Sequence, residues 1–266
     1  MSQIHYQIYP LAEAKPWVLL IHGLFGSLDN LSGLRRGLET DYNVLSIDLP
    51  DHGKSMASTK FSFDDNALLI IDLIKRLKIN KISIIGHSLG GKIAMKIALN
   101  APQVVTCLVV MDIAPVAYLP RHDAVFTGLQ SVPLDNITSR QDAEIFLKQS
   151  IEEASTRQFL LKSLYQDDDG WHWRFNLPLL KRDYAEIIQE INADIPYLGP
   201  TLFIKGELSD YLLPQHREKI LSLFPNSQSK LIGGTGHWLH AEKPSVCIKM
   251  IKLFFNKTMS SLANEQ

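Results

Sequence analysis

The chain has 266 residues, 45% of them hydrophobic, and its 27 basic and 28 acidic residues give a formal net charge of −1. A chain of this length and apolar content can bury a full core as one domain, or as one domain with an insertion. The balanced charge gives no reason to expect a nucleic-acid partner or a stable association with a membrane surface. The expected partner is therefore a small-molecule substrate.

The cysteines and the first residues predict a cytoplasmic protein. Cys107 falls inside a predicted strand and Cys247 on a predicted helix, so we expect two packed thiols and no disulfide. Since no Cys/His cluster has metal-ligand spacing, no metal is expected. Residues 1–6 lack a basic region followed by an apolar run, and no stretch approaches the length of a membrane span.

Strands and helices alternate along most of the chain, which predicts an α/β fold with a mostly parallel sheet covered by helices on both faces. Strands are predicted near 3–9, 17–22, 44–48, 82–86, 105–111, 201–205 and 228–232. Helices are predicted near 30–38, 63–79, 89–100, 214–224 and 243–256. Residues 116–195 break the alternation and are predicted to form a helical cap, inserted into a core of residues 1–115 and 196–258. Residues 259–266 are predicted to be a flexible tail.

The loop after the strand at 17–22 reads His-Gly-Leu-Phe-Gly over residues 22–26. Backbone N–H groups in such a loop can stabilise an oxyanion when a nucleophile lies nearby. The N–H of Leu24 is the first candidate for this donor, and that of Phe25 is the alternative.

The turn at 86–90, Gly-His-Ser-Leu-Gly, lies where a buried strand runs directly into a helix. A serine on so sharp a turn needs neighbours two positions away that carry almost no side chain, and Gly86 and Gly90 meet this need. The turn presents the hydroxyl of Ser88 above the sheet, and the N–H of Leu89 at the helix N-terminus is free to bind an anion. We therefore expect Ser88 to be a catalytic nucleophile and Leu89 the second oxyanion donor.

A serine hydroxyl needs a general base, and His237 is the candidate. It follows the last predicted strand on a glycine-rich loop, from which its side chain can reach over the sheet edge toward Ser88. The other histidines lack such a setting and are expected to be structural, with turn roles for the last two: His5, His122, His172, His216, His240, His52 and His87.

Two aspartates compete to orient His237. Asp112 ends the strand at 105–111, at the edge where parallel sheets place their ligands. Asp210 follows the strand at 201–205, the commoner place for such an acid, but it lies one residue beyond the usual Gly-x-x-Asp register, which falls on Ser209. Both give the order Ser, Asp, His of α/β-hydrolases, and we favour Asp112.

The cap contains helices beginning near Ser139, Thr156 and Pro178, and an alternating segment at 171–175. A cap inserted after the strand that bears Asp112 would lie above the catalytic edge. Its aromatic residues would line an acyl pocket or pack the cap on itself. Phe25, Trp238 and Trp173 are the candidate substrate-binding residues.

These motifs resemble those of the α/β-hydrolase superfamily, and within it the bacterial serine esterases. The resemblance covers most of the chain and is carried by the segments 22–30, 86–92, 111–115, 159–163, 173–176 and 236–244. It implies a serine esterase or thioesterase that acts on acyl esters, with its acid at Asp112. One departure is Asp51, which replaces the first glycine of the superfamily's Gly-His-Gly-x-Ser turn.

The expected mechanism needs no cofactor, because Ser88 and His237 suffice for an acyl-enzyme route. The first alternative is a lyase or C–C-bond hydrolase that uses the same three residues. The second is a catalytically idle binding module, because a fold does not dictate a function.

Overall fold

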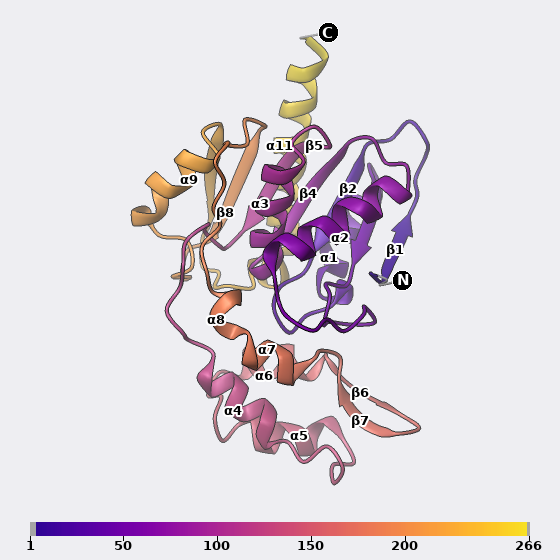
Figure 1. Cartoon of the computed structure of the whole chain (residues 1–266), viewed down its shortest axis with the longest axis vertical. Helices are drawn as coiled ribbons and strands as arrows, with labels where there is room; N and C mark the ends of the chain where they lie inside the picture. Colours follow the sequence, from indigo (N-terminus) through magenta and orange to yellow (C-terminus); the bar gives the residue numbers. More distant parts are fainter. Residues whose placement is uncertain (1–3, 265–266) are drawn as a thin grey trace.

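A computed structural model describes residues 4–264, and its centre is a seven-stranded sheet (Figure 1). The strand order is β1-β3-β2-β4-β5-β8-β9, and every neighbouring pair is parallel except β1 with β3. The strands are β1 (Tyr6–Tyr9), β2 (Trp17–Ile21), β3 (Asn43–Ile47), β4 (Ile82–His87), β5 (Val105–Met111), β8 (Thr201–Gly206) and β9 (Ser227–Ile232). The predicted α/β-hydrolase fold is therefore confirmed.

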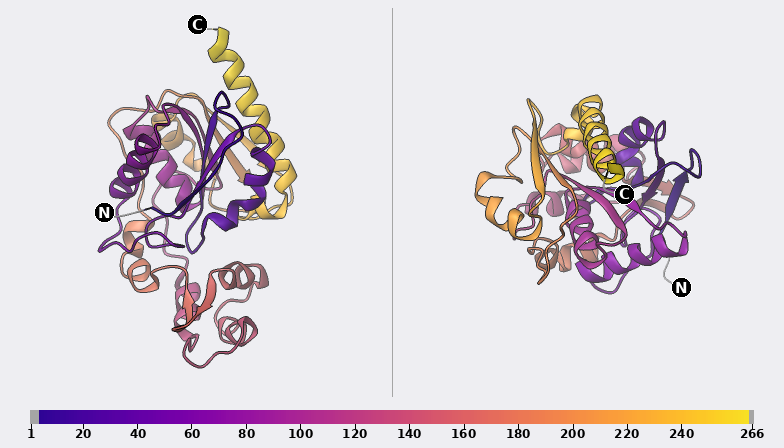
Figure 2. Two further views of the ribbon diagram at one scale, coloured as in Figure 1. Left: turned by 90° about the vertical axis from the view of Figure 1, so that its right-hand side faces the viewer. Right: turned by 90° about the horizontal axis from the view of Figure 1, so that it is seen from above.

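Helices cover both faces of the sheet (Figure 2). Successive side chains of each strand point to opposite faces, so the apolar ones are buried in two separate cores, one on each side of the sheet. In β2, Leu19 packs on one side and Leu20 on the other. The first face carries α2 (Phe63–Arg76), α3 (Leu89–Asn100) and α9 (Arg217–Leu223). The second carries α1 (Ser32–Leu38), α10 (Leu239–Glu242) and α11 (Pro244–Asn264). Short 3-10 turns at Leu28–Leu31 and Pro214–His216 precede α1 and α9.

The segment between β5 and β8 lies beyond the C-terminal edge of the parallel strands (Figure 1). It contains α4 (Asp123–Ser131), α5 (Arg140–Leu147), α6 (Ala154–Leu161), a hairpin of β6 (Leu164–Asp167) and β7 (Gly170–Trp173), α7 (Leu177–Arg182) and α8 (Tyr184–Ile187). As predicted, Ser139 caps a helix, because its hydroxyl accepts a hydrogen bond from the N–H of Asp142. Helix α4 and strand β6 were not predicted.

Helix α11 is longer than the sequence predicts. The segment 259–266, predicted as a flexible tail, is helical as far as Asn264, and its last two residues lie outside the described residues. No glycine or proline interrupts the chain between Pro244 and Asn264, and Met259 still packs against the core. Cys247 on this helix and Cys107 in β5 are both buried and free. Among the described residues, no helix has the length and apolar character needed to span a bilayer.

Candidate active site

Ser88 lies between β4 and α3 in a strained turn, with φ 53° and ψ −122°. Glycine is required on both sides of it. A Cβ added to Gly86 would lie 2.3 Å from the carbonyl oxygen of Gly90, and one added to Gly90 would lie 2.3 Å from that of His22. The close approach of α3 to β2 and β4 thus depends on these glycines, and it presents Ser88 at the sheet edge.

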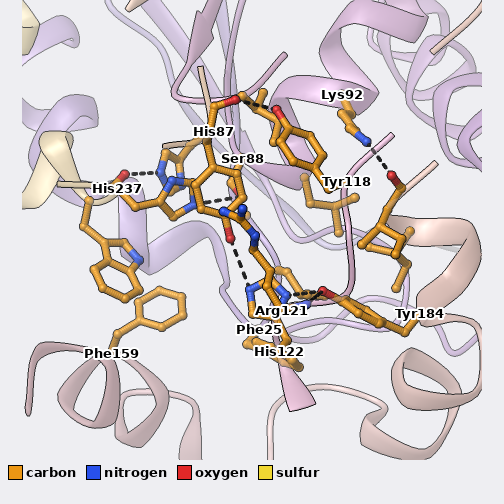
Figure 3. Close-up of a pocket in the computed structure, with 18 residues that line it drawn as sticks. Phe25, His87, Ser88, Lys92, Tyr118, Arg121, His122, Phe159, Tyr184 and His237 are labelled. Atoms are coloured by element: carbon orange, nitrogen blue, oxygen red, sulfur yellow. Dashed lines mark hydrogen bonds between the residues drawn. The ribbon is translucent and has the colours of Figure 1, made fainter. Parts of the chain in front are cut away.

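The structure brings Ser88, His237 and Asp112 into one hydrogen-bonded chain. Figure 3 shows Ser88 and His237, the two members of this chain that line the cavity. The Oγ of Ser88 lies 3.0 Å from Nε2 of His237, and Nδ1 of His237 lies 2.7 Å from Oδ2 of Asp112. Asp112 is fully buried at the end of β5, whereas the imidazole is 18% exposed. Since Oδ2 accepts from Nδ1–H, the free Nε2 can accept the proton of the serine hydroxyl.

Asp112, not Asp210, contacts the imidazole. A left-handed backbone at Asp112, φ 51°, directs its carboxylate toward the loops after β8 and β9, where it also accepts hydrogen bonds from the N–H of Gly206 and the hydroxyl of Ser209. Asp210 is 68% exposed and forms a bidentate pair with Arg121, at 2.8 and 3.2 Å. This pair lowers the pKa of Asp210. Ser209, the residue on which the Gly-x-x-Asp register falls, therefore donates a hydrogen bond to Asp112 instead of supplying the acid.

The backbone of the loop at 22–26 favours Leu24 over Phe25 as an oxyanion donor. The N–H of Phe25 already donates to Nε2 of His52, at 3.2 Å. The carbonyl of Gly23 accepts from Nδ1–H of His22 at 2.8 Å and from the N–H of Gly26 at 3.1 Å. Since a trans peptide directs its N–H and C=O in opposite directions, these bonds hold the N–H of Leu24 away from them. Leu24 and Leu89 both line the pocket above Ser88.

Buried histidines brace this site in their neutral form. His52 donates from Nδ1 to the carbonyl of Pro50, and burial lowers its pKa to about 4. Burial also lowers the pKa of His22, whose Nε2 accepts from the N–H of Leu49 at 3.0 Å. His87 donates to the backbone carbonyl of His237 at 2.8 Å, which anchors the loop that carries the imidazole. The sequence predicted only turn roles for His52 and His87.

The buried histidines predict a loss of stability in acid. His240 is a further buried histidine, and burial lowers its pKa from 6.5 to about 3. Between those two values the unfolded chain binds a proton at this residue and the folded chain does not. The contribution of His240 to stability is therefore complete above pH 6.5 and is lost progressively as the pH is lowered. Each such histidine contributes up to about 1.4 kcal/mol per pH unit. Urea unfolding between pH 7 and 4.5 should show a shallower decline for His240→Asn, and equal slopes for variant and wild type would contradict this account.

The cavity above Ser88 is lined from both sides, by loops of the core and by the cap (Figure 3). Phe25 and Trp238, two of the candidate substrate-binding residues, line it. Trp173 does not, because its ring stacks on Phe175 within the cap, with ring centres 5.6 Å apart. The sequence missed several lining residues, namely Lys92, Tyr118, Arg121, His122, Phe159, Tyr184, Ile187, Ile188 and Tyr211. Of these, Lys92 and Phe159 lie in segments that carry the family resemblance.

Three of the missed residues have ordered roles at the cavity wall. Tyr211 stacks on the His237 imidazole, with ring centres 4.0 Å apart. The Arg121 guanidinium lies over the ring of Tyr211, 4.5 Å from its centre. Lys92 of α3 is buried and donates to the carbonyls of Ile188 and Gln189, just after α8. Its burial lowers the pKa of the ammonium group to about 7. Both arrangements tie the cap to the core beside Ser88.

Known proteins resemble this chain over nearly its whole length. Residues 16–244 match the sequence profile of the alpha/beta hydrolase fold family. Esterase YbfF of Escherichia coli is 38% identical over 90% of this chain and 92% of its own length. The sn-1-specific diacylglycerol lipase ABHD11 of Xenopus tropicalis is 34% identical over 90% of this chain and 78% of its own length. A marine microorganism esterase of known structure superposes with a TM-score of 0.91 and is 31% identical to this chain. The superposition covers 96% of this chain and 100% of that chain.

The fold, the serine at the strand-to-helix turn and these relatives agree with the resemblance seen in the sequence motifs. The chain is a serine hydrolase and belongs to the α/β-hydrolase family.

Proposed function

We propose that the protein is a carboxylic ester hydrolase that works through an acyl-enzyme on Ser88. The observation that carries this proposal is the hydrogen-bonded chain from Ser88 through His237 to buried Asp112, at the floor of a cavity walled by apolar and aromatic side chains. A nucleophile, a base and an orienting acid in this order are the parts that acyl transfer requires.

In the first half-reaction, Oγ of Ser88 attacks the acyl carbon while its proton passes to Nε2 of His237. Asp112 holds the Nδ1–H of the resulting imidazolium, and the N–H groups of Leu24 and Leu89 stabilise the oxyanion. When the tetrahedral intermediate collapses, His237 gives its proton to the departing alkoxide. In the second half-reaction, water activated by His237 attacks the acyl-enzyme and releases the carboxylic acid.

The substrate is a small acyl ester, and acyl thioesters could follow the same steps because a thiolate needs less help in leaving. The lining favours an apolar acyl group, since Phe25, Phe159, Ile187 and Ile188 meet it from both core and cap. The names of the relatives, an esterase and a diacylglycerol lipase, support ester hydrolysis.

The test is turnover of p-nitrophenyl esters from acetyl to octanoyl, followed by stoichiometric labelling with a fluorophosphonate. We expect hydrolysis of at least the short esters and complete inactivation by one label per chain. An acyl-CoA thioester with the same acyl group then measures the thioesterase rate. Labelling without ester turnover would contradict the proposal and favour a lyase, and neither labelling nor turnover would favour an idle binding module.

A further inference from the structure

Phe25, the residue after the oxyanion donor Leu24, has an unusual backbone. Its φ is 62°, in the left-handed region where an L side chain crowds the neighbouring carbonyl. A residue stays in this region only when its surroundings hold it there. The contacts of Phe25 therefore decide the shape of the loop that presents the N–H of Leu24.

Three sets of contacts hold Phe25, and two of them come from the cap. Its carbonyl accepts a hydrogen bond from the hydroxyl of buried Ser163, just after α6, at 2.7 Å. Its ring packs in the cap against Phe126 and Phe175, with ring centres 5.4 and 5.1 Å apart. The third contact is the bond from its N–H to Nε2 of His52. Phe25 is 3% exposed, so neither peptide group can exchange these partners for water.

The loop that carries His52 is itself fastened to the cap, through the residue that departs from the superfamily turn. The carbonyl of Asp51 accepts from the N–H of Asn176 at 2.9 Å, and its Oδ1 accepts from the Asn176 side chain at 3.0 Å. Asp51 has φ 64°, where glycine would be unstrained. The aspartate thus accepts a strained backbone and supplies a side-chain bond to the cap that glycine lacks.

We propose that Ser163 of the cap and His52 of the core are positioning residues that make the oxyanion hole depend on a seated cap. This inference rests on the proposed function. Ser163 and His52 fix the peptide groups on either side of Phe25, and the preceding N–H of Leu24 is then held where charge develops on the acyl oxygen. Loss of either bond leaves a buried polar group of Phe25 unpaired, so the loop relaxes and the donor is misplaced.

The test compares the transition state with the ground state in Ser163→Ala and His52→Ala. Three quantities are measured with one acyl chain: kcat/KM for its p-nitrophenyl ester, Ki of its trifluoromethyl ketone and Ki of an ether of the same shape. The ketone forms an oxyanion with Ser88, and the ether does not. We expect kcat/KM and ketone affinity to fall together by about 10- to 100-fold, less than for complete loss of a donor. Ether affinity should stay within about twofold, because it does not use the oxyanion hole.

The matched control is Ser131→Ala, which removes another cap hydroxyl that donates to a backbone carbonyl, that of Gly128 at 2.8 Å. It should change none of the three quantities. The double variant Ser163→Ala/His52→Ala should lose less than the two single losses combined, because both bonds hold the same residue. Equal losses of ketone and ether affinity, unchanged ketone affinity, or fully additive losses would overturn the inference.

Two further outcomes are separated by the design. If Ser163→Ala proves unfolded in urea titration, His52→Ala decides by the same comparison of ketone and ether affinity. His52 is not among the described residues that line the pocket, so its loss removes no direct contact with either inhibitor. If Ser88→Ala retains full activity, the proposed function fails. If wild-type activity needs Ser88 but Ser163→Ala behaves like wild type, only the positioning inference fails.

Discussion

Replacement of Ser88 by alanine should lower kcat/KM for ester hydrolysis by about 10⁴-fold or more and leave the fold intact. The hydroxyl contacts Nε2 of His237 and lines the cavity, so its removal takes away the nucleophile without opening a hole in the core. Steady-state rates with a p-nitrophenyl ester, together with urea unfolding, measure the two effects separately.

Ser131→Ala is the control for this substitution, since it removes an exposed serine hydroxyl of the cap. It should retain wild-type activity. A folded Ser88→Ala protein with near-wild-type turnover would show that another residue attacks the ester.

The two aspartates should differ sharply in their effect on rate. Asp112→Asn should cost on the order of 10⁴-fold in kcat, because an amide facing Nδ1 of His237 favours the wrong imidazole tautomer. Asp210→Asn should cost less than about tenfold, since Asp210 contacts Arg121 and not the imidazole. Both variants are assayed with one ester over one pH range.

Stability must be measured beside these rates, because Asp112 is fully buried and also accepts hydrogen bonds from Gly206 and Ser209. A folded but inactive Asp112→Asn protein is the expected result. The assignment would be reversed by an active Asp112→Asn and an inactive Asp210→Asn. Comparable partial losses would mean that both carboxylates serve His237.

Ser88 and His237 could be predicted because their signals are local. The glycines at 86 and 90, between an apolar strand and a helix, leave few conformations for the turn, and the glycine-rich loop before His237 follows the last strand directly. The alternation of strands and helices was enough to predict the sheet, because each core strand is a short apolar run between turn residues.

The choice of acid could not be made from pattern alone. Asp112 and Asp210 follow β5 and β8, which are neighbours in the sheet, so both lie at the same edge. The deciding features are the left-handed φ of Asp112 and the ion pair of Asp210 with Arg121, which forms across 89 residues of sequence. Neither leaves a periodic signal.

The cap was predicted as a unit but not in detail, since its residues meet the core over long sequence distances. Helix α4 was missed because no side chain caps its start at His122 and Gly128 lies inside it. Trp173 was wrongly placed in the pocket: alternation at 171–175 predicts a strand but does not say which face meets the cavity. Two of the cap-side contacts of Phe25, Ser163 and Phe175, lie in segments that carry the family resemblance, whereas Phe126 does not.

The most direct test of the central claim is mass spectrometry after reaction with p-nitrophenyl dimethylcarbamate, whose carbamoyl-enzyme hydrolyses slowly. An acyl-enzyme mechanism predicts one dimethylcarbamoyl group on the peptide that contains Ser88, formed in proportion to the activity lost and absent from Ser88→Ala. A carbamoyl group on any other residue of the inactivated enzyme, or equal modification of Ser88→Ala, would contradict it.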